Sequence, residues 1–224
     1  LQCLSMVAWS FATAKQKDPA LFADLAGEIV TSAGAAKPQE IANTLWAYAK
    51  SRCQETALFA VLGDAALEGS LLWSFKPQEL SNTVWAFATI GLQHPPLFRK
   101  AVAVAIGKRR ELSPQNSANI LWAYAKLQVC RRSGLFPALL ALLSSSAAAS
   151  GAGSAGTGGT ARHKPQEISA ILWAAAREDY SAYQRLGSAV TRESVAWVEE
   201  LPPEALEALA EMGMDSPGFF ENVM

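Results

Sequence analysis

The stretch KPQEIANTLWAYAK, residues 37–50, decides the fold because the chain repeats it. Its first four letters recur at Lys76–Glu79 and Lys164–Glu167, and each time a tryptophan follows the proline after eight residues. Aligned on that tryptophan, the chain holds five related copies, separated by 37, 39, 37 and 51 residues; the tryptophans are Trp9, Trp46, Trp85, Trp122 and Trp173. Repetition at such a period is typical of proteins built from stacked units.

Other positions recur with the tryptophan. A glutamine precedes it by seven residues in all five copies, and an asparagine precedes it by three in the central ones (Asn43, Asn82 and Asn119). An aromatic residue and an alanine follow it in the first four copies, and a Leu-Phe pair comes twelve or thirteen residues later. Each unit therefore predicts two helices. Proline and glutamate suit the first turn of the first helix, and the second begins near Leu-Phe.

No single helix pair can bury apolar residues on two sides, so the units must stack. We expect an all-α fold, an α-solenoid of about five helix-pair repeats of 37–39 residues. The array is expected over residues 1–192. Residues 144–160, a Gly/Ser/Ala tract, are interpreted as an insertion inside one repeat. Residues 193–224, with eight acidic and no basic residues, are interpreted as an acidic capping segment that includes a C-terminal helix.

Composition argues against several function classes. The three cysteines have no metal-ligand spacing, the two histidines accompany no nucleophile, and no glycine-rich phosphate loop is present. We therefore expect no enzyme activity, no cofactor, no metal and no small-molecule substrate. The apolar runs are too short to cross a bilayer, so a soluble protein is expected. Residues 76–177 contain twelve basic and three acidic residues, a local charge of +9, which suggests an acidic partner or simply solvated helix faces.

The pattern PQEL(S/A)N(T/I)(L/V)WA(Y/F)A followed by LF, as in Pro77–Ala88 with Leu97–Phe98, resembles the octotricopeptide repeat. The resemblance covers Leu1 to about Val190. It implies a helical-pair array that acts on RNA in a chloroplast or mitochondrion. The chain has few copies, and its first and last copies lack the asparagine.

Two sets of residues are candidates for RNA contact. On the first helix, Glu40, Asn43, Ala47 and Lys50 fall on one polar stripe, and its small centre predicts a shallow groove for a single strand. Four of the repeated tryptophans are interpreted as core residues, with base stacking as the alternative: Trp46, Trp85, Trp122 and Trp173. The asparagines either bond the next repeat or line the groove. The second set is a basic rim at helix ends. The candidate residues are Asn43, Lys50, Asn82, Thr89, Arg99, Lys100, Lys108, Arg109, Arg110, Asn116, Asn119, Lys126, Arg131, Arg132 and Arg177.

The resulting hypothesis is an RNA-binding helical-repeat protein of organellar gene expression. It would act in RNA stabilisation, processing or translation, on single-stranded or ribosomal RNA, with protein neighbours in a ribonucleoprotein particle such as a ribosome. The alternative is a structural scaffold that contacts mainly proteins in a large organellar assembly. Neither hypothesis involves a membrane.

Overall fold

The computed structural model describes residues 1–129. Within them the chain forms α-helices and one short 3-10 helix, and no strand. The helices are α1 (Gln2–Thr13), α2 (Pro19–Ser32), η1 (Ala33–Ala35), α3 (Pro38–Lys50), α4 (Thr56–Leu67), α5 (Leu71–Ser74), α6 (Pro77–Thr89), α7 (Pro95–Gly107) and α8 (Pro114–Leu127). The predicted fifth repeat, the 144–160 insertion and the 193–224 cap lie outside the described residues.

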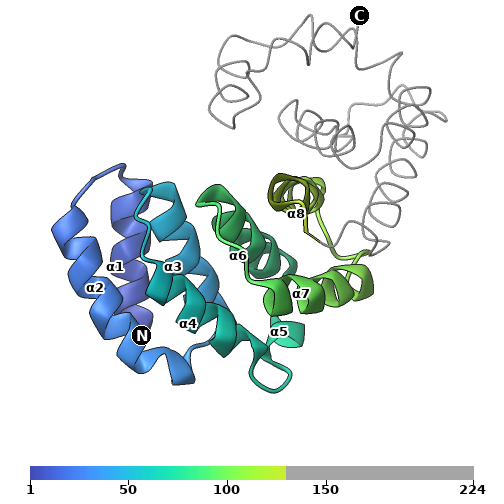
Figure 1. Cartoon of the computed structure of the whole chain (residues 1–224), viewed down its shortest axis with the longest axis horizontal. Helices are drawn as coiled ribbons and strands as arrows, with labels where there is room; N and C mark the ends of the chain where they lie inside the picture. Colours follow the sequence, from blue (N-terminus) through green and yellow to red (C-terminus); the bar gives the residue numbers. More distant parts are fainter. Residues whose placement is uncertain (130–224) are drawn as a thin grey trace, which may run out of the picture.

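The helices pack in two layers. The predicted first helices α1, α3, α6 and α8 lie side by side in chain order, and each packs mainly on the next (Figure 1). The predicted second helices α2, α4 and α7 form the other layer. The described part is therefore all-helical, with three helix pairs followed by the first helix of a fourth. The short helices η1 and α5 lie in the connections between pairs, where the repeat pattern predicted no helix.

The first helices begin where the sequence places them, at Pro38, Pro77 and Pro114. The glutamate two residues after the proline has a specific role. Its carboxylate accepts a hydrogen bond from the backbone N–H that precedes the proline, at 3.0 Å for Glu40 and 2.7 Å for Glu79. Asn116 replaces it in α8 and forms a reciprocal capping box with Ser113. These bonds satisfy groups that a helix start leaves free.

The Leu-Phe phenylalanine and the aromatic residue after the tryptophan form a repeated core contact. Phe22 packs edge-to-face on Tyr48 at 5.0 Å between ring centroids, and Phe98 packs in the same way on Tyr124 at 5.0 Å. The third pair, Phe59 with Phe87, is 5.1 Å apart. Each pair joins the second helix of one unit to the first helix of the next, so the repeat spacing positions the stacking core.

Candidate nucleic-acid interface

The first helices α1, α3 and α6 each have one face whose side chains are exposed or half-buried. In α3 this face carries Gln39, Asn43, Trp46 and Lys50, which follow one another at steps of four, three and four residues and so share one side of the helix. Gln39 and Lys50 are exposed, whereas Asn43 and Trp46 are half-buried. We call these four positions the tryptophan stripe.

The other first helices carry the same four positions, and these side chains are more exposed in α1 than in α6 or α8. All four positions are exposed in α1, where they are Gln2, Met6, Trp9 and Thr13. In α6 the stripe consists of Gln78, Asn82, Trp85 and Thr89, and in α8 of Gln115, Asn119, Trp122 and Lys126. In both helices the glutamine is exposed and the other residues are half-buried, except that Trp122 is buried. The stripes therefore place the indoles of Trp9, Trp46 and Trp85, amide groups and the cations Lys50 and Lys126 on one side of this layer, whereas the indole of Trp122 is buried.

The predicted groove with a small centre is wrong. Ala47, Ala86 and Ala123, its expected floor, are fully buried. Alanine at this position lets adjacent first helices approach closely, so it lies between helices and not on the open face. Glu40 is likewise buried while it caps α3. The tryptophan takes the place that the sequence interpretation gave to alanine.

The indoles are not equivalent. Trp122 is only 3% exposed, whereas Trp9 is 44% exposed. The rings of Trp85 and Trp122 lie 6.5 Å apart with 30° between their planes. The ammonium of Lys126 sits 4.6 Å from the centroid of the Trp122 ring, and burial lowers the pKa of this lysine. The core interpretation is thus confirmed for Trp122 and is partial for Trp46 and Trp85, whereas Trp173 lies outside the described residues.

The candidate asparagines divide into two kinds. Asn116 has structural partners, since its amide Nδ2 donates to Ser81 Oγ at 3.1 Å in addition to its capping bonds. By contrast, Asn43, Asn82 and Asn119 make no side-chain hydrogen bond to any part of residues 1–129. The expectation that they bond the next repeat is not met for Asn43 and Asn82, and the repeat that follows Asn119 lies outside the described residues. Their amides are available to a ligand on the open face.

The second basic set belongs to α7 and the turn after it, in the other layer. Lys100 Nζ donates to the carbonyls of Leu67 and Gly69 at 3.0 and 2.8 Å, and Lys108 Nζ donates to the carbonyl of Phe75 at 2.6 Å. These lysines thus hold the connection between α4 and α6. Arg109 of the same set is also bonded, since its guanidinium donates to the carbonyl of Ile106 at 3.0 Å.

The remaining members of the basic set are either exposed without a partner or lie beyond the described residues. Arg99 and Arg110 are exposed and have no partner within residues 1–129. Arg131 and Arg132 of this set lie beyond the described range, as does Arg177 of the predicted polar stripe. Within residues 1–129, the two predicted sets therefore lie on different helix layers. Three members of the second set, Lys100, Lys108 and Arg109, already donate hydrogen bonds to backbone carbonyls.

Sequence reasoning missed two cations at the helix ends. Lys15 and Arg52 occupy the position six residues after the tryptophan, with left-handed backbone φ values of 54° and 58°. Gly91 and Gln128 take the same position, with φ of 75° and 54°. In each unit the residue after it donates its N–H to the carbonyl of the aromatic residue in the preceding helix, as Cys53 does to Tyr48 at 2.9 Å. The signal that could have found them is the constant offset from the tryptophan.

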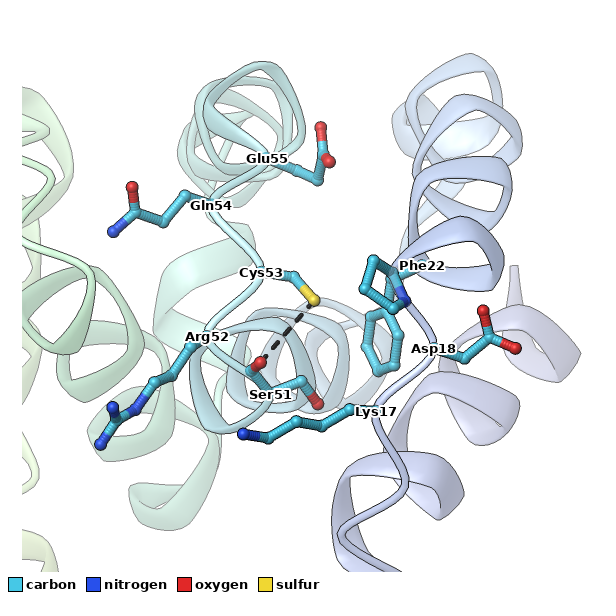
Figure 2. A pocket seen from close by; sticks show the side chains of 9 residues that line it. Lys17, Asp18, Phe22, Ser51, Arg52, Cys53, Gln54 and Glu55 are labelled. Carbon is cyan, nitrogen blue, oxygen red and sulfur yellow. Dashed lines mark hydrogen bonds between the residues drawn. The ribbon is translucent and has the colours of Figure 1, made fainter.

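A hollow of about 280 Å³ separates the loop after α1 from the loop after α3. It is lined by Lys17, Asp18, Pro19, Phe22, Ser51, Arg52, Cys53, Gln54 and Glu55 (Figure 2). Burial, and secondarily the charge of Glu55, raises the pKa of the Cys53 thiol, so this cysteine is not activated as a nucleophile.

Residues 1–129 contain no cluster of three or more potential metal-ligating side chains. None of the helices described here is long and apolar enough to cross a membrane.

Comparison with known proteins identifies no relative: no family model matches the chain, and no curated protein matches it.

Proposed function

We propose that the chain is an α-solenoid of about five octotricopeptide-like repeats with an acidic C-terminal cap, and that it binds single-stranded RNA in organellar gene expression. The bound RNA would be a transcript or an exposed segment of ribosomal RNA, contacted along the tryptophan stripes. Such a protein acts by binding, in RNA stabilisation, processing or translation, without catalysis or a cofactor. Protein neighbours in a ribonucleoprotein particle of a mitochondrion or chloroplast are part of this proposal.

One observation carries the proposal: α3 and α6 each place a half-buried indole beside an asparagine whose amide makes no hydrogen bond within residues 1–129, and α1 adds an exposed indole. Indole faces stack on any base, and this stacking contributes about 1–3 kcal/mol per base. Amides such as those of Asn43 and Asn82 can bond base edges, which are accessible only in unpaired RNA. Lys50 adds a cation for the phosphate backbone. Side chains of this kind, repeated at a regular spacing, suit an extended polymer better than a compact ligand.

The test is equilibrium binding of the purified chain to fluorescein-labelled oligonucleotides, followed by fluorescence anisotropy. We expect an oligouridylate of about ten nucleotides to bind, with affinity that falls as salt rises. Duplex RNA of equal length should compete poorly, because its bases are already stacked. Equal competition by duplex RNA, or the absence of any binding to single strands, would contradict the proposal.

The second candidate function is a scaffold that contacts mainly proteins, and one observation favours it. Helix α1 exposes Met6, Val7 and Trp9 at 57%, 39% and 44%. Val7 takes the place of Thr44 and Thr83, which are fully buried in α3 and α6. An uncovered apolar helix face of this kind is typical of a protein contact. Cross-linking of the native complex separates the two functions, since a scaffold would give adducts to protein and none to RNA.

A further inference from the structure

Four exposed cations gather at the ends of α1 and α3. Lys15, Lys17, Lys50 and Arg52 are exposed, and their side chains make no hydrogen bond or ion pair within residues 1–129. This distinguishes them from Lys100, Lys108 and Arg109, whose side chains donate to backbone carbonyls. The first four are therefore free to bind an anion, whereas the other three already have structural partners.

Two of these cations, Lys15 and Arg52, have a left-handed backbone conformation that glycine adopts at a lower cost in free energy. A left-handed conformation is unfavourable for a residue with a side chain, and helices that end at such a position usually have glycine there. Gly91 shows that the turn accepts glycine in this chain. Lys15 and Arg52 nonetheless keep long charged side chains there, at φ 54° and 58°. Strain of this kind is typical of functional positions.

The side chains of these cations are oriented away from the nearby carboxylates. In Figure 2 Lys17 and Arg52 extend away from Asp18 and Glu55, the acidic residues of the same two loops. Asp18 is occupied in addition as the cap of α2, where its carboxylate accepts a hydrogen bond from the N–H of Leu21 at 3.0 Å. Lys50 lies one helical turn after Trp46 on the tryptophan stripe. Lys50 therefore lies on the exposed face of α3, and Lys15, Lys17 and Arg52 lie in the turns that follow α1 and α3.

The indoles of these two helices also have free surface. Trp9 is 44% exposed and Trp46 is half-buried, and neither makes a ring or cation contact within residues 1–129. At the other end of the described stack, Trp122 is buried beneath Lys126 and beside Trp85. A base can therefore stack on Trp9 or on the exposed part of Trp46 without displacing an aromatic ring or a cation.

We infer that the main RNA subsite lies at this end. Unpaired bases stack on Trp9 and Trp46, and the phosphates that flank them bind Lys15, Lys50 and Arg52. The inference rests on the proposed RNA-binding function and gives it a location. It also assigns Lys100 and Lys108, two of the sequence candidates, to the structure of the α4–α6 connection.

The test measures the affinity of the full chain for labelled oligouridylate of about ten nucleotides. Trp46→Leu keeps apolar volume but removes the stacking face, and it should weaken binding about tenfold, while Trp46→Phe retains most of the affinity. Arg52→Gly should weaken binding severalfold and reduce the salt slope by about 0.7. The same variant should raise the melting temperature, because glycine relieves the backbone strain. A purely structural Arg52 would not lose affinity while the protein gains stability.

A matched pair of double variants completes the test. Lys50→Gln with Arg52→Gly, and Arg99→Gln with Arg110→Gln, each remove two exposed positive charges. The first should weaken binding at least several times more than the second. Equal losses, a larger loss in the second, or unchanged affinity in Trp46→Leu would overturn the subsite while leaving RNA binding in place. If the unmodified chain binds no single strand, the proposed function fails and the subsite with it.

Discussion

The phenolic oxygen of Tyr48 donates a hydrogen bond of 2.6 Å to the backbone carbonyl of Phe22, which lies 26 residues earlier in the chain. Tyr124 and Phe98 repeat the bond at 2.7 Å with the same separation. In the unit between them Phe87 replaces the tyrosine and offers no hydroxyl. The two tyrosines therefore add a directional contact to the edge-to-face packing that joins consecutive helix pairs.

Removal of the Tyr48 hydroxyl tests this contact. Tyr48→Phe keeps the ring on Phe22 and loses only the hydrogen bond, so the free energy of unfolding should fall by about 1 kcal/mol. Urea denaturation followed by tryptophan fluorescence measures it. RNA affinity should not change, because Tyr48 is fully buried. A stability equal to that of the unmodified chain would show that the hydroxyl has no net effect.

The same residue should make stability sensitive to alkali. Burial, together with the charges of Cys53 and Glu55, raises the pKa of Tyr48 well above its ordinary value. In the folded state the phenol stays protonated above about pH 10, whereas in the unfolded chain it ionises there. Unfolding then releases a proton, so its contribution to stability is complete below about pH 10 and is lost as the pH rises further.

Comparison of the unmodified chain with Tyr48→Phe isolates this effect. The unmodified chain should lose stability more steeply above about pH 10, with a difference of at most about 1.4 kcal/mol per pH unit. Urea midpoints at about pH 8 and about pH 11 measure the two slopes. Parallel slopes would mean that Tyr48 ionises equally easily in both states.

The helix pairs could be predicted from the sequence because their determinants are local and repeated. Proline marks the starts of α3, α6 and α8, and the Leu-Phe pair marks the second helices. The two layers follow, since each pair has apolar residues on more than one side. Local signals of this kind do not depend on how distant parts of the chain meet.

The open face could not be predicted so easily, because a stacked helix is covered on several sides. Both Ala47 and Trp46 lie within or beside the apolar arc of α3, and periodicity alone does not say which one faces a neighbour. Packing decides it: adjacent first helices approach closely only at a small residue, so alanine is buried and the larger indole is left at the edge. An alanine directly follows the tryptophan in three of the described copies, as Ala47, Ala86 and Ala123, and this recurrence is the signal that could have corrected the interpretation.

The roles of the basic residues depended on contacts that are distant in sequence. Lys108 bonds Phe75, 33 residues before it, and Lys100 bonds Leu67 at the same separation. Composition counted both as free charge. Only the three-dimensional arrangement distinguishes them from Arg99 and Arg110, which remain exposed.

Gly63 should be intolerant of a side chain. An added Cβ would lie 2.7 Å from Cδ2 of His94 and 3.1 Å from Cζ of Phe87. The imidazole cannot move freely, since its Nδ1 accepts a hydrogen bond from the N–H of Leu97 at 3.3 Å and its Nε2 lies 3.2 Å from Asp64. Gly63→Ala should therefore destabilise the protein by about 1–3 kcal/mol despite the better helix propensity of alanine.

Gly27 provides the matched control for that substitution. It also lies inside a helix, α2, and nothing comes within 4 Å of an added Cβ. Gly27→Ala should stabilise the protein by up to about 1 kcal/mol. Thermal unfolding of both variants measures the contrast. Similar shifts in the same direction would show that the contact with His94 does not constrain α4.

Lys108 should matter for stability and not for RNA. Its ammonium, half-buried, donates to the carbonyl of Phe75 at 2.6 Å, and Lys108→Met keeps the aliphatic stem while leaving that carbonyl without this donor. We expect a loss of about 1–3 kcal/mol in the free energy of unfolding. Arg110→Gln, which removes an exposed charge two residues later, should change stability by less than about 0.5 kcal/mol. Both variants should retain oligouridylate affinity within about twofold, since neither residue lies on a tryptophan stripe. A Lys108→Met protein that keeps its stability but loses RNA affinity would place this lysine in the interface after all.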